Sequence, residues 1–143
     1  MNLASVIICD SATVREGLLH ILGGGISMIW RPEAPFELGV VLAFSVQVMP
    51  DDNDFLEAPN FVLRLDDDAD GSVLMELGGV LPLPRPSGRI TYVPVVLDVS
   101  TMMVPHYGEF TVRLKIDGLP EVATPLTAVD SKPDVSATAS TTP

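Results

Sequence analysis

An acidic segment near the middle of the chain has the residue types of a cation site. Residues 66–71 read DDDADG, which places aspartates at the first, third and fifth positions and a glycine at the sixth, as in an EF-hand calcium loop. The twelfth position of such a loop is a glutamate, but here it is Leu77, and Glu76 comes one residue early. The polar turn of a β-hairpin explains the same residues, because aspartate tolerates the backbone conformations of turns. We favour the hairpin; the candidate metal ligands are Asp66, Asp68 and Asp70.

Three other groups of residues have chemistry to be considered. Cys9 precedes Asp10 and lies eleven residues before His20, so a Cys–His nucleophile is conceivable, but a cysteine that ends an apolar run is more often buried. His20 and His106 are the only histidines, and a zinc site would need further aspartate ligands. The triple glycine at 23–25 lacks the Lys-Ser/Thr of a phosphate loop and indicates a bend. We predict no catalytic residue, no cofactor and no enzymatic activity.

A few apolar residues fall in expected loops and connections and are therefore candidates for a protein interface. Aromatic residues and methionine are enriched in such interfaces. The candidates are Trp30, Met102, Met103 and Tyr107.

The elements that must position these residues are short strands separated by turn signals. Residues 110–116 alternate between apolar and polar side chains, and residues 61–65 and 72–77 flank the acidic turn as a hairpin. Further strands are expected at 3–9, 26–30, 39–49, 90–99 and 119–129. Pro94 indicates an edge or a bulge.

Residues 13–22 are ambiguous. Thr13 and Glu16 have the spacing of a helical capping box, but Gly17 would lie in the first turn of that helix. The alternative is a loop over 13–17 followed by a strand over 18–22, which we favour because the rest of the chain is β-like.

The composition excludes several classes of partner. The 143 residues carry 19 acidic against 8 basic side chains, a net charge of −11 that disfavours nucleic acid and anionic membranes. Hydrophobic residues make up 47% of the chain and charged residues only 19%, which predicts either that both faces of the structure are covered or that a partner or second copy buries some of the surface. The single cysteine and the lack of a basic n-region at the N-terminus favour a cytoplasmic protein.

These patterns predict one all-β domain over residues 1–129, an antiparallel β-sandwich of about eight strands, followed by a disordered tail over 130–143. The function expected is that of a non-enzymatic structural or protein–protein interaction module. The alternative is a calcium-dependent binding module that uses the aspartate-rich loops.

Three segments also resemble a family of small, uncharacterised bacterial β-sandwich proteins, a domain of unknown function. They are LASVIICDSATVREGLLHILGGG at 3–25, VLRLDDDADG at 62–71, and VPVVLDV with YGEFTVRLKIDG between 93 and 118. Residues 105–108 depart from the family's pattern, since Tyr107 and Gly108 stand in the reverse order. The resemblance covers about residues 1–129 and implies the sandwich fold, with no catalytic residues.

Overall fold

The computed structural model describes residues 1–52, 58–85 and 87–131. Within these ranges the chain forms strands and no helix. The strands are β1 (Asn2–Arg15), β2 (Leu18–Gly24), β3 (Met28–Arg31), β4 (Phe36–Glu37), β5 (Val41–Val48), β6 (Asn60–Asp67), β7 (Val73–Val80), β8 (Thr91–Asp98), β9 (Met103–Val104), β10 (Gly108–Ile116) and β11 (Val122–Asp130).

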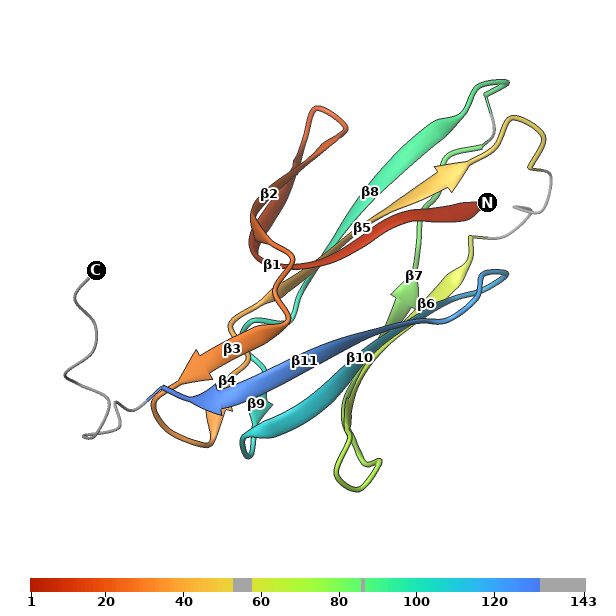
Figure 1. The fold of residues 1–143 in the computed structure, drawn as a ribbon. Helices are drawn as coiled ribbons and strands as arrows, with labels where there is room; N and C mark the ends of the chain where they lie inside the picture. Colours follow the sequence, from red (N-terminus) through yellow and green to blue (C-terminus); the bar gives the residue numbers. More distant parts are fainter. Residues whose placement is uncertain (53–57, 86, 132–143) are drawn as a thin grey trace.

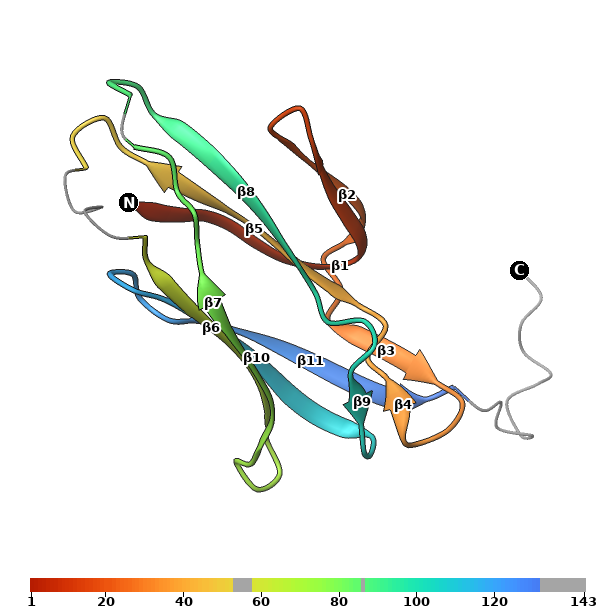
Figure 2. The same cartoon turned by 180° about the vertical axis from the view of Figure 1, so that it is seen from behind.

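Two sheets form the layers of a sandwich, as Figures 1 and 2 show from opposite sides. The first, sheet A, has the order β2-β1-β5-β8, and the second, sheet B, has the order β3-β11-β10-β6-β7. Strands β4 and β9 make a two-stranded sheet at one end. The all-β sandwich is therefore confirmed. The very short strands β3, β4 and β9 bring the number described to eleven.

Alternating side chains build the core between the layers, as expected for strands with one buried face. In β10, Phe110, Leu114 and Ile116 are buried as predicted, and they face Phe44 and its neighbours on β5. Strand β5 is covered on both faces at its start. Val41 and Ala43 point away from the main core and belong to a second apolar cluster on the outer face of sheet A.

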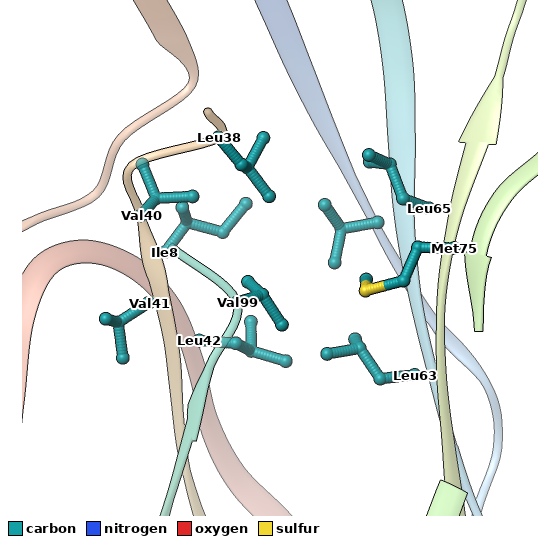
Figure 3. A pocket seen from close by; sticks show the side chains of 10 residues that line it. Ile8, Leu38, Val40, Val41, Leu42, Leu63, Leu65, Met75 and Val99 are labelled. Carbon is teal, nitrogen blue, oxygen red and sulfur yellow. The ribbon is translucent and has the colours of Figure 1, made fainter. Parts of the chain in front are cut away.

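A small gap remains between the layers, with β5 on one side and β6, β7 and β10 on the other. Figure 3 shows aliphatic side chains from the two sheets pointing toward one another across it. Its free volume is about 10 Å³, enough for a single water molecule at most, and its lining is apolar. This gap is a packing defect of the core and offers nothing to a polar ligand. The labelled residues are Ile8, Leu38, Val40, Val41, Leu42, Leu63, Leu65, Met75 and Val99.

Several boundaries differ from the sequence prediction. Strand β1 does not end at Cys9 but continues to Arg15, so the predicted loop over 13–17 is wrong and only Glu16 and Gly17 form the turn. The extension is possible because β2 provides hydrogen-bonding partners for residues 11–15.

The C-terminal part of sheet B also departs from the prediction. Strand β3 pairs with β11 in parallel, although every other pairing in the three sheets is antiparallel. Pro125 lies in β11 before the parallel pairing begins at Thr127, so its missing N–H breaks no bond to β3. Asp130, predicted to begin the tail, is the last residue of β11. Residues 132–143 of the predicted tail lie outside the described residues.

Candidate interaction surface

The N-terminal hairpin forms an arm that extends from sheet A. We call residues 10–24 the arm; Figure 1 shows it beside β8, joined to the sheets at its base. Its turn is Glu16-Gly17, and both residues have positive φ (55° and 72°), as a two-residue type I′ turn requires. The pairs Thr13–His20 and Val14–Leu19 follow from this turn. The segment that was ambiguous in sequence is therefore a hairpin.

A glycine makes the arm bend at its base. Gly23 has φ +64°, and a Cβ atom added there would lie 2.4 Å from Oδ2 of Asp10. Only glycine satisfies both the conformation and the close approach. The predicted bend at 23–25 is confirmed at this residue and at Gly25, where φ is +87°.

The arm has one face packed on sheet A and one face exposed. Ala12 and Leu19 contact the outer cluster of Cys9, Val41 and Ala43, so the arm lies partly over the outer face of sheet A. On the opposite face, Leu18 and Leu22 are 62% and 71% exposed. Single exposed aliphatic side chains are common, but these two lie on the same face of one strand, with only His20 between them on that face.

The same strand is an edge of its sheet. Among the described residues β2 is the outermost strand of sheet A, with β1 on its only paired side. Edge strands are usually protected by lysine, proline or a bulge. Strand β2 contains neither lysine nor proline, and its register with β1 from residue 18 to residue 22 is regular. Its exposed backbone is therefore open to pairing with another strand.

A second exposed apolar region lies at the end of the sandwich that carries β3, β4 and β9 (Figure 1). Ile29 of β3 is buried, whereas Met28 and Trp30 point outward, with Trp30 57% exposed. Met103 is also exposed, while Met102 and Tyr107 are half-buried against the core. The structure thus brings the predicted interface residues to one end of the molecule, with Trp30 and Met103 the more accessible.

Arg31 ties this end together. Its Nη1 and Nη2 donate to the carbonyl oxygens of Trp30 and Leu38 at 2.8 and 2.7 Å. The hydroxyl of Tyr107 donates to the carbonyl of Arg31 at 2.8 Å, and its ring stacks on Phe36 with 5.6 Å between centroids. Tyr107 is therefore a structural residue of the Arg31 loop more than a free contact residue. An open groove of about 390 Å³ runs between β3 and the base of the arm.

The acidic turn joins β6 to β7, as predicted, and protein groups already bind its carboxylates. Asp66 accepts from Nε of Arg64 at 2.8 Å and from Nε of Arg113 at 2.9 Å. Burial opposes ionisation of Asp66, but these two guanidinium groups outweigh it and lower its pKa. Asp68 accepts from the hydroxyl of Thr111 at 2.7 Å, and Asp70 caps the N–H of Ser72.

Asp67, between these residues, points into the sandwich and is only 4% exposed. Oδ2 of Asp67 lies 2.7 Å from Nε2 of His106, and Nδ1 of His106 lies 2.7 Å from the carbonyl of Tyr107. A carbonyl oxygen and a carboxylate oxygen both accept hydrogen bonds, so this arrangement favours the imidazolium form of His106. The bond to the Tyr107 carbonyl, followed by the contact with Asp67 and the charge of Asp70, raises the pKa of His106.

The three aspartates proposed as metal ligands therefore point to different protein partners. Within residues 1–52, 58–85 and 87–131, no three His, Cys, Asp or Glu side chains are grouped so that they could hold a metal ion. His106 is engaged by Asp67, and His20 lies on the exposed face of the arm. Calcium binding by the acidic turn stays a prediction, with its carboxylates already engaged in the fold.

Cys9 is buried at the base of the arm, with 0% of its surface exposed. Its thiol donates to the carbonyl of Val41 at 3.5 Å. Burial, with the charge of Asp10, raises the pKa of the thiol, which opposes thiolate chemistry. Cys9 pairs with Gly24 and His20 with Thr13, which separates the two by four residues along the hairpin, about 13 Å. Cys9 and His20 therefore do not form a nucleophile–base pair.

One comparison with known proteins identifies the family of the chain. Residues 4–129 match the model of DUF6941, a family of unknown function, and the chain belongs to this family. No curated protein and no solved structure matches it. The family resemblance expected from the sequence is thus confirmed. In the part of the chain that the structure describes, no helix has the length and apolar character needed to span a membrane.

Proposed function

We propose that this chain is a non-enzymatic interaction module that contacts other proteins through the edge of its arm. The observation that carries the proposal is the exposure of Leu18 and Leu22, at 62% and 71%, on an edge strand without lysine or proline. Backbone pairing along such an edge supplies affinity, and alternate side chains supply specificity. Trp30 and Met28 on the neighbouring strand β3 extend the apolar surface available to a partner.

The polar side chains of the acidic turn support this proposal over an enzyme. The carboxylates of Asp66, Asp67 and Asp68 are bound by Arg64, His106 and Thr111 respectively. These groups stabilise the β6–β7 hairpin and are not arranged around a common vacant point. The free, buried thiol of Cys9 fits a reducing compartment, and we assign the module to the cytoplasm on that ground.

The test is recovery of partners by the folded chain from its native cell, followed by mass spectrometry. The double variant Leu18→Thr/Leu22→Thr removes apolar surface from β2. The matched control is Val73→Thr/Val80→Thr, which changes two residues of similar exposure, 50% and 57%, on β7, an edge strand of sheet B.

We expect the chain to recover a specific protein, or a second copy of itself, with the β7 control and not with the β2 variant. Equal recovery by both variants would place the contact elsewhere and reject the arm as the binding surface. Recovery of nothing, together with a monomer at tens of micromolar, would reject the interaction module itself.

A further inference from the structure

The sequence of the arm's edge strand is nearly symmetric. Residues 18–22 read LLHIL, so that leucine and isoleucine occupy matching positions on either side of His20. Antiparallel pairing of two identical strands about a two-fold axis places residue i opposite residue j and residue j opposite residue i. Centred on His20, this pairing sets Leu18 opposite Leu22 of the second copy and Leu19 opposite Ile21 of the second copy. Every apolar residue then meets an apolar residue on the same face.

The charges of the molecule also favour this edge for self-association. The chain carries a net charge of −11, which hinders the approach of two copies over most of their surfaces. Residues 18–24 include no carboxylate and no ammonium or guanidinium group. Two copies can therefore bring their β2 strands together without placing like charges opposite each other.

The other edges of the two sheets are less suitable. Strand β8 contains Pro94, which has no backbone N–H to donate. Strand β7 contains Glu76 and follows the acidic turn, so two copies would bring carboxylates together. Strand β3 has only four residues. Strand β2 has seven residues, is regular from residue 18 to residue 22 and carries no formal charge.

We propose that two copies of this chain associate by antiparallel pairing of β2 with β2 across a two-fold axis at His20. The two arms then form one continuous four-stranded sheet. This inference rests on the proposed function and names its partner as a second copy. The contact is centred on an edge strand of seven residues and is smaller than a standard interface of about 20–30 residues a side, so we expect the association to be weak.

The axis position gives a charge-swap test. In the proposed dimer, residue 20 of each copy lies directly opposite residue 20 of the other. Like charges at such a pair weaken association, whereas opposite charges support it. His20→Glu and His20→Lys are each expected to weaken self-association by about fivefold or more, and a 1:1 mixture of the two is expected to restore it. Sedimentation velocity at micromolar to tens of micromolar protein measures the self-association of each variant and of the mixture.

The matched control is Thr13→Glu. Thr13 pairs with His20 inside each arm and lies on the same exposed face, but one strand farther from the edge. Its charge is therefore farther from the second copy, and we expect the self-association of the wild-type chain to be retained. Circular dichroism and thermal melts of every variant show whether the chain is folded.

A wild-type chain that remains monomeric at tens of micromolar overturns the proposal. So does a mixture of His20→Glu and His20→Lys that stays monomeric while the wild type dimerises, or a Thr13→Glu variant that is weakened as strongly as His20→Glu. If the wild type is monomeric but still recovers another protein in an arm-dependent manner, the second copy is rejected and the interaction module stands.

Discussion

Two hairpins of this chain, the arm (residues 10–24) and β6–β7, use their side chains in opposite ways. The β6–β7 hairpin carries four aspartates around its turn, and each has a partner in the fold. Asp66 binds Arg64 and Arg113, Asp67 binds His106, Asp68 binds Thr111, and Asp70 caps the N–H of Ser72. The arm carries aliphatic residues of the kind that form cores, yet Leu18 and Leu22 face outward. The carboxylates, whose pattern suggests a ligand site, bind groups of the fold, whereas these leucines, whose pattern suggests a buried strand, are exposed.

The largest effect expected from this comparison is on the stability of β6–β7. Asp66→Ala removes the acceptor of two arginines, and hydrogen bonds to charged groups contribute about 2 kcal/mol. We therefore expect urea denaturation to give a free energy of unfolding lower by about 2 kcal/mol for this variant. In contrast, Leu22→Ala on the arm should change that free energy by no more than about 0.5 kcal/mol, because the side chain is exposed. Similar losses for both variants would remove the distinction between the hairpins.

The second prediction concerns the covered base of the arm. Cys9 is buried beneath Ala12 and Leu19, so a thiol reagent reaches it only when the arm opens. Leu19→Ala should speed native-state labelling of Cys9 by about fivefold, while Leu22→Ala leaves the rate unchanged. Rapid labelling of the wild-type chain would show that the arm does not cover the thiol.

The third prediction is a pH dependence that arises from the contact of His106 with Asp67 at the end of β6. The pKa of His106 is raised in the folded state, so its contribution to stability is complete below the unfolded value of about 6.5. That contribution is lost as the pH rises through the higher folded value. Thermal melts at a series of pH values from mildly acidic to mildly basic should show the melting temperature falling in the wild type and less so in His106→Gln. A pH profile identical in the two proteins would contradict the assignment.

At acidic pH the dependence of stability on pH has the opposite sign. The pKa of Asp66 is lowered in the folded state, so its contribution is present above the unfolded value of about 3.9 and is lost as the pH falls through the folded value. Asp66→Ala should therefore show a weaker loss of stability in acid than the wild type.

The smallest effect is expected from calcium. Because Asp66, Asp68 and Asp70 are engaged by protein groups, millimolar calcium should raise the melting temperature by no more than about a degree or two. A ligand at 100 times its dissociation constant would add about 2.7 kcal/mol. A stabilisation of that size, abolished in Asp68→Asn/Asp70→Asn, would establish the alternative function, a calcium-dependent binding module.

The sequence predicts the strands and turns of this molecule better than it predicts which side chains contact one another and which are exposed. The alternation in residues 110–116 and the acidic hairpin turn are local signals, and both are found; the turn begins at Asp68, because β6 continues to Asp67. The pairing of His106 with Asp67 joins residues 39 positions apart, and no local pattern indicates it. The apolar run around Leu22 is equally compatible with a buried strand and an exposed arm. Its exposure follows from the bend at Gly23, which directs the hairpin away from the core.

The parallel pairing of β3 with β11 has a consequence for the order of events in folding. It joins residues 28–31 to residues 127–130, so nearly the whole chain must leave the ribosome before β3 finds its neighbour. Until then Trp30, the only tryptophan, has no strand beside it. In refolding experiments its fluorescence should reach the native value later than the far-ultraviolet circular dichroism signal of the local hairpins; simultaneous changes would show that the sheet closes in one step. The arm, made of residues close in sequence, is expected to form early, while the chain is still being made.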